Sequence, residues 1–252
     1  MTQAVTLITG ASAGLGAEFA RQLSKRGQRL VLAARRKDRL DSLAAELGNA
    51  RSVAIDLSEP GAAARLIADV EAADEHVDTL VNNSGFGLWG RFARLDQVRQ
   101  REMLDLNCGA LTDLCAAVVP GMIERRSGAI LNVASTAAFQ PGPGMAVYFA
   151  TKAYVLSFTE ALHEELKPHG IRVTALCPGP TRTEFGDVAG LGGSVLFNRV
   201  AMDSGPVVRA GLEGLERNRA VVVPGITNKI GAQSTRLAPR ALVRRIVAAI
   251  KV

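Results

Sequence analysis

Two residues that can exchange a proton, Tyr148 and Lys152, lie four positions apart in the stretch VYFATK. On a helix, residues at this spacing share a face, so both side chains can reach the same bound molecule. A free tyrosine has a pKa of about 10, which is too high for proton exchange near neutral pH, and a neighbouring ammonium favours the phenolate. The pair therefore predicts an acid/base group, with a chance pairing on a helix surface as the alternative.

A glycine-rich turn near the start of the chain predicts where a cofactor would bind. The turn, TGASAGLG (9–16), joins an apolar strand pattern to a helical pattern. Such a turn lets the backbone approach a pyrophosphate and directs amides at a helix N-terminus towards negative charge. Its spacing, GxxxGxG, differs from the fingerprint GxGxxG, and a purely structural turn is the alternative. The candidate contacts are Gly10, Ser12, Gly14, Leu15 and Gly16.

The end of the second predicted strand indicates which dinucleotide would bind. In a site for NAD(H), a carboxylate about twenty residues further on binds the ribose hydroxyls, whereas arginine accommodates the 2′-phosphate of NADP(H). Here the sequence reads ARRK, with Arg35 and Arg36 and without a carboxylate. Guanidinium groups form charge-assisted hydrogen bonds with a phosphate. NADP(H) is therefore favoured over NAD(H), with Arg35 as the first candidate and a basic helix start without a ligand as the alternative.

The fold that would position these residues is indicated by the sequence pattern. Hydrophobic residues make up 48% of the 252 residues and aromatic residues 4%, which suits aliphatic packing between a sheet and helices. Short apolar runs alternate with longer helical patterns. This alternation predicts one α/β domain, residues 1–252, with a Rossmann-type doubly wound parallel sheet of about seven strands and helices on both faces.

Two segments depart from this alternation. Residues 181–215 are rich in glycine and weakly periodic, which predicts a mobile lid on the substrate side, with hinge glycines in GLGGSVLF (190–197). Residues 239–251 predict a C-terminal helix that begins near Pro239 and carries an apolar stripe opposite basic residues. Packing on the sheet or on a partner subunit is favoured for this helix, with an anionic membrane surface as the alternative.

Charge and the rarer residue types exclude several classes of function. The net charge is +6, but the basic residues are dispersed among acidic ones, so no nucleic-acid partner is predicted. Cys108, Cys115 and Cys177 lack the spacing of a zinc or disulfide site, so no metal is expected, and Cys177 is predicted to be an inert buried thiol. The N-terminus has no signal-peptide pattern, and no apolar run reaches the length of a membrane span. A cytoplasmic protein without an integral membrane segment is expected.

In order along the chain, the motifs resemble those of the classical short-chain dehydrogenase/reductase (SDR) family over nearly the whole length. They are TGASAGLG, Asp56 after the third strand, NNSG (82–85) after the fourth, Asn107 in a long helix, Ser135 after the fifth strand, YFATK thirteen residues later and PGPTRT (178–183) after the sixth. Each motif alone is weakly specific, whereas the ordered set is strongly specific. The family pattern at 82–85 is usually NNAG, so Ser84 is a small departure.

The resemblance implies a role for each of four catalytic residues. In the family the tyrosine, here Tyr148, is the acid/base, and the lysine, here Lys152, binds the nicotinamide ribose and lowers the pKa of the tyrosine. The serine, Ser135, holds the substrate oxygen, and the helix asparagine, Asn107, supports a path for water and protons. The further cofactor contacts implied are Asp56, Leu57, Asn83, Gly85, Pro178, Gly179, Thr181 and Thr183.

A substrate site is expected at the carboxyl ends of the strands. Its candidate residues are Phe86, Trp89, Phe139 and Phe185. Apolar candidates without an arginine clamp favour a hydrophobic ketone or aldehyde over a small acid. The sequence therefore predicts an NADP(H)-dependent oxidoreductase that transfers a hydride between nicotinamide and a carbonyl or alcohol substrate. The alternative is a non-catalytic NADP-binding regulatory protein on the same fold.

The resemblance also implies a homo-oligomer, either a dimer or a tetramer. Helices over residues 98–126 and 149–167 are the interface candidates. The extended C-terminus departs from the short tail of many family members, so a dimer is favoured over a tetramer.

Overall fold

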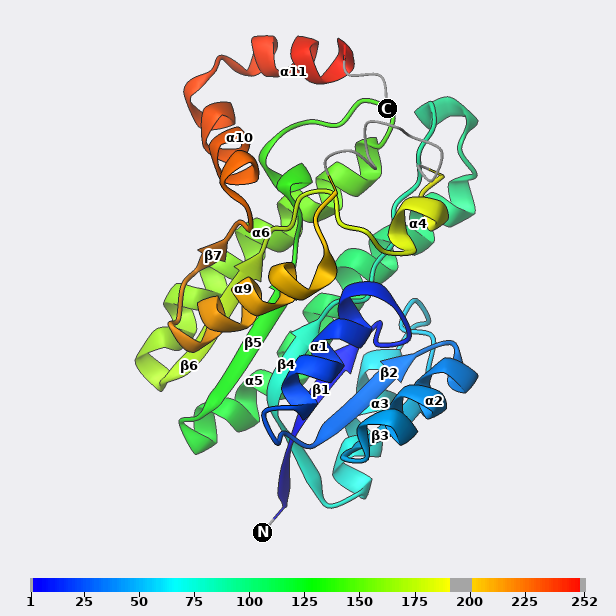
Figure 1. Ribbon diagram of the computed structural model, residues 1–252, viewed down its shortest axis with the longest axis vertical. Coiled ribbons are helices and arrows are strands. Elements are labelled where there is room, and N and C mark those ends of the chain that lie inside the picture. Colours follow the sequence, from blue (N-terminus) through cyan, green and yellow to red (C-terminus); the bar gives the residue numbers. More distant parts are fainter. Residues whose placement is uncertain (1, 191–200, 250–252) are drawn as a thin grey trace.

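The apolar runs of the sequence form a seven-stranded sheet whose strands follow the order β3-β2-β1-β4-β5-β6-β7 (Figure 1). The computed structural model describes residues 2–190 and 201–249. Every neighbouring pair of strands is parallel, and the chain moves from the central β1 to one edge before it returns to build the other. This is the doubly wound order, so the predicted Rossmann-type fold is confirmed.

The strands at the centre of the sheet are buried on both faces. They are short and rich in Val, Leu, Ile and Ala, which is typical of parallel strands covered by helices on both sides. The seven strands are β1 (Gln3–Thr9), β2 (Leu30–Ala34), β3 (Ala50–Ala54), β4 (Glu75–Asn82), β5 (Gly128–Val133), β6 (Ile171–Leu176) and β7 (Val221–Val222). All residues of β2 and β5 are buried, whereas those of the edge strand β3 are only partly covered.

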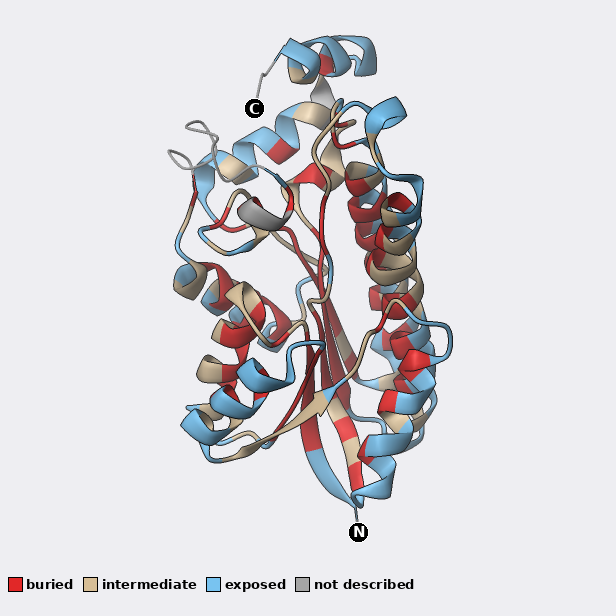
Figure 2. Cartoon of the chain, turned by 90° about the vertical axis from the view of Figure 1, so that its right-hand side faces the viewer, coloured by how far each residue is buried: buried red, intermediate tan, exposed pale blue. Residues whose placement is uncertain are grey.

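Helices cover both faces of the sheet, as Figure 2 shows with the sheet seen nearly edge-on. One face carries α1 (Gly14–Ser24), α2 (Lys37–Leu47) and α9 (Ser204–Glu216), and the other carries α3 (Ala62–Ala72), α5 (Leu111–Arg125) and α6 (Ala146–Leu166). Each helix buries an apolar face, with Phe19 in α1 and Leu66 in α3 fully enclosed. The remaining elements are η1 (Phe92–Arg94), α4 (Gln97–Leu104), η2 (Asp105–Ala110), η3 (Thr136–Phe139), η4 (Lys167–His169), α7 (Phe185–Val188), α10 (Ile226–Leu237) and α11 (Arg240–Ala249).

The long helix predicted over residues 98–126 consists of three consecutive pieces. A π-helical turn, η2, separates α4 from α5. The whole stretch, Gln97–Arg125, is long and apolar enough to cross a membrane by length and composition alone. Its residues Leu114 and Met122 are buried in the core beside α3 and α6, however, as in the core helix of a soluble protein.

Residues 204–216, placed in a mobile lid by the sequence pattern, form α9 instead. Their apolar side chains pack against β5, β6 and α1, so this part of the 181–215 segment belongs to the core. The glycines that suggested mobility allow close packing. A Cβ on Gly214 would lie 2.2 Å from Val222 Cγ2, and one on Gly211 would lie 2.9 Å from Leu176 Cδ2. Most of the predicted hinge, 190–197, lies outside the described residues.

The predicted C-terminal helix corresponds to α11, but the sequence analysis did not predict α10 before it. The two helices extend past the carboxyl ends of the strands (Figure 1). Val243 is buried, whereas Leu242 and Ile246 are about half exposed. Val247, which also belongs to the predicted stripe, is partly buried, whereas Ile250 lies outside the described residues. The predicted stripe is therefore only partly covered within the described chain.

Asn132 joins the centre of the sheet to α6 and generates a test of the fold. Its Oδ1 accepts a hydrogen bond from Asn82 Nδ2 at 2.9 Å, and its Nδ2 donates to Thr159 Oγ1 at 3.0 Å, all within the core. Asn132→Ala should lower the free energy of unfolding by about 2 kcal/mol, because buried polar groups lose their partner. Urea unfolding measures the change. Ser42→Ala, at an exposed site on α2, is the control, and an equal effect in both variants would contradict the prediction.

Candidate active site

The turn between β1 and α1 brings backbone segments closer together than any side chain would allow. Gly10 and Gly14 have φ of 65° and 54°, in the left-handed region that favours glycine. A Cβ on Gly16 would lie 2.1 Å from the carbonyl oxygen of Gly10. Among the described residues, no side chain caps the N-terminus of α1, and its first turn holds no acidic residue. The free amides at this end of α1 therefore suit a pyrophosphate.

Asn83 holds this turn in shape. Its Nδ2 donates to the carbonyl oxygens of Thr9 and Gly10 at 3.0 and 3.2 Å. In return, the Oγ1 of Thr9 accepts hydrogen bonds from the backbone amides of Asn83 and Ser84. The Asn83 side-chain amide is thus hydrogen-bonded to the protein backbone, so Asn83 positions the turn, and its predicted contact with the cofactor stays a prediction.

The two arginines after β2 take different partners. Arg36 donates from Nε and Nη2 to Ser12 Oγ in the glycine turn, at 3.2 and 3.1 Å. Arg35 turns towards Asp56 after β3, with its Nη1 3.7 Å from the carboxylate. Arg36, rather than the first candidate Arg35, therefore lies beside the turn that suits a pyrophosphate.

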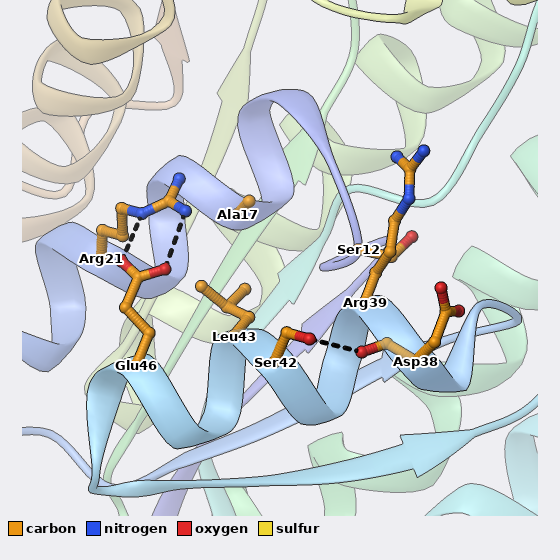
Figure 3. Close-up of a pocket in the computed structure, with 8 residues that line it drawn as sticks. All are labelled: Ser12, Ala17, Arg21, Asp38, Arg39, Ser42, Leu43 and Glu46. Atoms are coloured by element: carbon orange, nitrogen blue, oxygen red, sulfur yellow. Dashed lines mark hydrogen bonds and ion pairs between the residues drawn. The ribbon is translucent and has the colours of Figure 1, made fainter.

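A third arginine, which the sequence analysis missed, joins this edge of the sheet. Arg39 projects from α2 past Ser12 and lines a shallow pocket between α1 and α2 (Figure 3). Its Nη1 forms an ion pair with Glu184, which also accepts from Arg36 at 2.8 Å. The basic run ARRKDR was the available signal. Because α2 begins at Lys37, Arg39 lies three residues after Arg36 and therefore on the same side of the helix start.

The predicted catalytic residues lie close together at the carboxyl end of the central strands. Ser135 follows β5 and begins η3, while Tyr148 and Lys152 share the buried face of α6, as their spacing predicts. Lys152 Nζ donates to the carbonyl oxygen of Val133 at 2.7 Å. A Cβ on Gly85 would lie 2.9 Å from Asn107 Oδ1 and 3.7 Å from Lys152 Nζ, so both side chains lie beside that glycine.

Asn107 lies within the π-helical turn η2 and is 1% exposed. Its Oδ1 accepts from the Phe86 amide at 3.1 Å, and its Nδ2 donates to the Phe86 carbonyl oxygen at 3.0 Å and to Thr151 Oγ1 at 3.1 Å. Asn107 therefore fixes the backbone after β4 against α6. The sequence analysis missed Thr151, although its place beside Lys152 in the YFATK motif was the available signal.

Burial dominates the electrostatics of the tyrosine and the lysine. It raises the pKa of Tyr148 to about 12, with a hydrogen bond to Ser135 acting in the opposite direction, and it lowers the pKa of Lys152 to about 8. The Lys152 nitrogen lies 5.8 Å from the centre of the Tyr148 ring and is hydrogen-bonded to a backbone carbonyl. In the protein by itself, burial therefore determines the pKa of Tyr148, and the predicted lowering of this pKa by Lys152 and the bound cofactor stays a prediction.

Three of the four aromatic substrate candidates gather around Tyr148. Phe86, Trp89 and Phe185 belong to one apolar cluster, and the ring centres of Phe185 and Tyr148 lie 5.3 Å apart. Phe139 does not join them. It lies at the end of η3 and packs on the main core beside Glu160, Val222 and Lys229, towards α10. Phe139 therefore lies apart from the aromatic cluster around Tyr148, and its place in the substrate site stays a prediction.

Gly87 makes room for this aromatic cluster and was missed in the sequence. A Cβ there would lie 2.9 Å from Met145 Cε, 3.0 Å from Phe185 Cζ and 3.2 Å from Tyr148 Cδ2. The glycine two positions after NNSG was the available signal.

The loop after β6 passes beside the glycine turn. The carbonyl oxygen of Pro178 accepts from the Thr136 amide at 2.9 Å, next to Ser135, and Thr181 Oγ1 donates to the Gly179 carbonyl at 2.9 Å. A Cβ on Gly14 would lie 3.0 Å from Thr183 Cβ. These expected cofactor contacts therefore share one edge of the sheet with the catalytic residues. Leu57 differs, because its side chain is buried in the core and offers a ligand only its backbone.

A protein-family model described as short chain dehydrogenase matches residues 4–190. The chain belongs to the short-chain dehydrogenase family. Within the SDR family, the NADP-dependent 3-hydroxy acid dehydrogenase YdfG of Salmonella typhi is 38% identical over 187 residues, which cover 73% of this chain and 75% of that protein.

Solved SDR structures match nearly the whole chain. A short-chain dehydrogenase from Sphingobium yanoikuyae in complex with NADPH gives a TM-score of 0.84 at 34% identity, covering 99% of this chain and 96% of that one. The bulky-bulky ketone specific alcohol dehydrogenase from Comamonas testosteroni gives a TM-score of 0.77 at 30% identity, covering 100% and 95%. The resemblance drawn from the ordered motifs is therefore confirmed.

In the described part of the chain, the side chains that could bind a metal are not clustered, and the three cysteines are buried or partly buried. Within residues 2–190 and 201–249, no group of three or more His, Cys, Asp or Glu side chains is arranged to hold a metal ion. Burial raises the pKa of Cys108 to about 11 and the pKa values of Cys115 and Cys177 to about 12. These thiols stay protonated near neutral pH, which makes them poor nucleophiles.

The buried lysine of this SDR site predicts how its stability depends on pH. Because the folded chain holds the pKa of Lys152 at about 8, below the 10.5 of an unburied lysine, the folded state loses stability as pH falls through that range. Lys152→Met should therefore be more stable than the wild type near pH 7 by about 2 kcal/mol, allowing for the lost hydrogen bond.

That advantage should shrink as the pH rises towards about 9.5, because the wild-type lysine is then neutral in the folded chain. Urea unfolding of both proteins at several pH values measures the difference. Lys167→Met, at an exposed site, is the control and should show no such trend. A pH-independent difference for Lys152→Met would refute the assigned cause.

Proposed function

We propose that this chain is an NADP(H)-dependent oxidoreductase that transfers a hydride between the cofactor nicotinamide and a carbonyl or secondary-alcohol substrate. The observation that carries the proposal is the group formed by the partly buried Ser135 and the buried Tyr148, Lys152 and Asn107. This group lies at the same edge of the sheet as the glycine turn. A regulatory protein that only binds a cofactor would need no proton donor there. The group therefore favours an enzyme over the non-catalytic alternative.

The bound cofactor supplies the hydride, and residues of the chain manage the substrate oxygen and its proton. In the reductive direction, the hydroxyls of Ser135 and Tyr148 donate hydrogen bonds to the carbonyl oxygen, and Tyr148 gives that oxygen its proton. The Tyr148 phenol is protonated near neutral pH, but burial raises its pKa to about 12 in the protein by itself, so proton donation requires the phenolate to be stabilised when the ligands are bound. The ammonium of Lys152 then favours the phenolate that remains.

The basic residues beside the glycine turn support NADP(H) as the cofactor. Arg36 and Arg39 direct guanidinium groups to the edge of the sheet where dinucleotide-binding folds accommodate a 2′-phosphate. Arginine suits a phosphate because its planar group donates two parallel hydrogen bonds. The Salmonella relative is NADP-dependent by name, and the Sphingobium structure holds NADPH, which agree with this assignment.

The substrate proposed is a hydrophobic ketone or aldehyde. Phe86, Trp89, Phe185 and Met145 form an apolar surface beside Tyr148, and the similar Comamonas enzyme is named for bulky ketones. The second candidate is a 3-hydroxy acid, after the Salmonella relative. Arg99 Cζ lies 4.7 Å from the centre of the Phe86 ring, which places a cation for a carboxylate beside this cluster, but Arg99 also pairs with Glu102.

A cytoplasmic homo-oligomer, either a dimer or a tetramer, is the proposed form of the enzyme. Tyr154 and Phe158 stack on the outer face of α6 with ring centres 5.8 Å apart, and Tyr154 is 43% exposed. An exposed aromatic pair on this helix supports the interface implied by the family resemblance.

Tyr148→Phe tests the proposed function directly. It should reduce NADPH consumption by about 100-fold or more on any accepted substrate, because the proton donor is lost, while NADPH binding stays intact. The assay follows NADPH absorbance across bulky aryl ketones and aldehydes, and the reverse reaction across 3-hydroxy acids with NADP⁺.

Tyr154→Phe is the matched control, since it makes the same change on the same helix at an exposed site whose hydroxyl contacts Thr112. It should retain wild-type turnover. Wild-type turnover in Tyr148→Phe would refute the assigned proton donor, and NADPH binding without turnover of any compound would favour the regulatory alternative.

Two arginine variants test the preference for NADP(H). Arg36→Ala should weaken NADPH binding by about tenfold and NADH binding by less than about twofold, because only NADPH carries the 2′-phosphate. Arg35→Ala should have the smaller effect, since Arg35 faces Asp56. Titration of coenzyme fluorescence measures both. A larger loss in Arg35→Ala, or equal losses for the two coenzymes, would contradict the assignment.

A further inference from the structure

Glu184, in the loop after β6, pairs with two arginines that come from the opposite end of the sequence. Its Oε2 lies 2.8 Å from Arg36 Nη1, and its Oε1 pairs with Arg39 Nη1. Arg36 also donates to Ser12 in the glycine turn. These three residues, Glu184, Arg36 and Arg39, are called the Glu184 cluster below.

In the Glu184 cluster, two arginines bind a carboxylate in the way that they could bind a phosphate. Two guanidinium groups converge on one carboxylate at the edge of the sheet where a 2′-phosphate is accommodated. Hydrogen bonds from Arg36 and then Arg39 lower the pKa of Glu184, so the side chain is an anion at neutral pH. A carboxylate of the chain itself therefore occupies the positive charges that an incoming phosphate needs.

The exposure of the cluster makes this carboxylate replaceable. The side chains of Arg36, Arg39 and Glu184 are 42%, 45% and 45% exposed. Ion pairs at such exposure stabilise a protein by only about 0–1 kcal/mol each. A phosphate dianion has more charge and more acceptor oxygens than a carboxylate, so it can displace Glu184 from the two arginines.

The next residue, Phe185, covers the reactive tyrosine. Its ring centre lies 5.3 Å from that of Tyr148, and Gly87 leaves space for the contact. Tyr148 is 8% exposed beneath this cover. Glu184 contacts the arginines and the next residue, Phe185, contacts Tyr148. A displacement of Glu184 would therefore also displace Phe185.

The base of the loop is fixed by contacts of its own. The amide of Arg182 donates to the Met202 carbonyl at 2.9 Å, the amide of Met202 donates to the Pro180 carbonyl at 2.9 Å, and Arg182 forms an ion pair with Asp203 at 2.7 Å. These contacts do not involve the Glu184 cluster. A change at Glu184 is therefore expected to move Phe185 rather than the base of the loop.

We propose that Glu184 competes, from within the chain, for the 2′-phosphate subsite and holds Phe185 over Tyr148 until the phosphate of NADP(H) replaces it on Arg36 and Arg39. The inference rests on the proposed function, since it takes NADP(H) as the cofactor. NAD(H), which lacks the phosphate, leaves Glu184 in place. Glu184 thereby links recognition of the correct coenzyme to access to the acid/base group.

The first test measures coenzyme binding to Glu184→Gln by fluorescence titration. The variant should bind NADPH about fivefold more tightly than the wild type, because the internal competitor has lost its charge, and its affinity for NADH should change by less than about twofold. Glu46→Gln is the matched control. It removes the same charge from an exposed ion pair, with Arg21 at 2.8 Å, at the other end of the pocket in Figure 3.

The second test measures hydrogen exchange in residues 181–190. The probes are adenosine 2′,5′-bisphosphate and adenosine 5′-monophosphate, which differ only in the 2′-phosphate. The bisphosphate should speed exchange in this segment of the wild type, and the monophosphate should not. Glu184→Gln should exchange rapidly before either is added, and Glu46→Gln should behave as the wild type.

The possible results distinguish a failure of the inference about Glu184 from a failure of the proposed function. If the wild type binds NADPH and Glu184→Gln binds it no more tightly, the inference about Glu184 is overturned while the proposed function stands. Equal tightening for NADPH and NADH would also overturn it, since the effect would then be one of net charge. If the wild type binds no NADPH, the proposed function falls and the inference falls with it.

Discussion

The close approach of backbone at the first turn is the constraint on which the rest of the site depends. Gly16 can reach the carbonyl of Gly10 only because it has no side chain, and the amide of Asn83 joins this turn to the end of β4. The free N-terminus of α1 therefore faces the same edge as Ser135 and the loop after β6. Parallel strands bring these chain segments, distant in sequence, to one place.

The burial of Tyr148 and Lys152 in α6 has a cost in stability. A tyrosine and a lysine are enclosed in an apolar environment where the neutral form of each is favoured. The burial of Lys152 works against the folded state near neutral pH, where the lysine is charged, while the same environment encloses Tyr148. Residues that destabilise a fold while serving its chemistry are a common feature of enzyme sites.

Much of this arrangement could be predicted from the sequence, because each feature had a local cause. Apolar runs marked the strands, glycine spacing marked the turn, and the four-residue interval placed Tyr148 and Lys152 on one helix face. What could not be predicted depends on contacts between distant segments. The glycines of α9 lay in a segment predicted to be mobile, whereas they allow close packing against Val222 and Leu176. Phe139 packs on the main core rather than with the other aromatic candidates, and the pairing of Glu184 with Arg36 spans 148 residues.

The edge strand β7 has a consequence for how the chain behaves in a crowded solution. With only Val221 and Val222 in the ladder, it exposes very few unpaired backbone groups along that side of the sheet. A long, flat edge would offer a template for strands of other molecules, whereas one this short offers almost none. The chain thus protects this side of its parallel sheet against edge-to-edge aggregation by ending the ladder early.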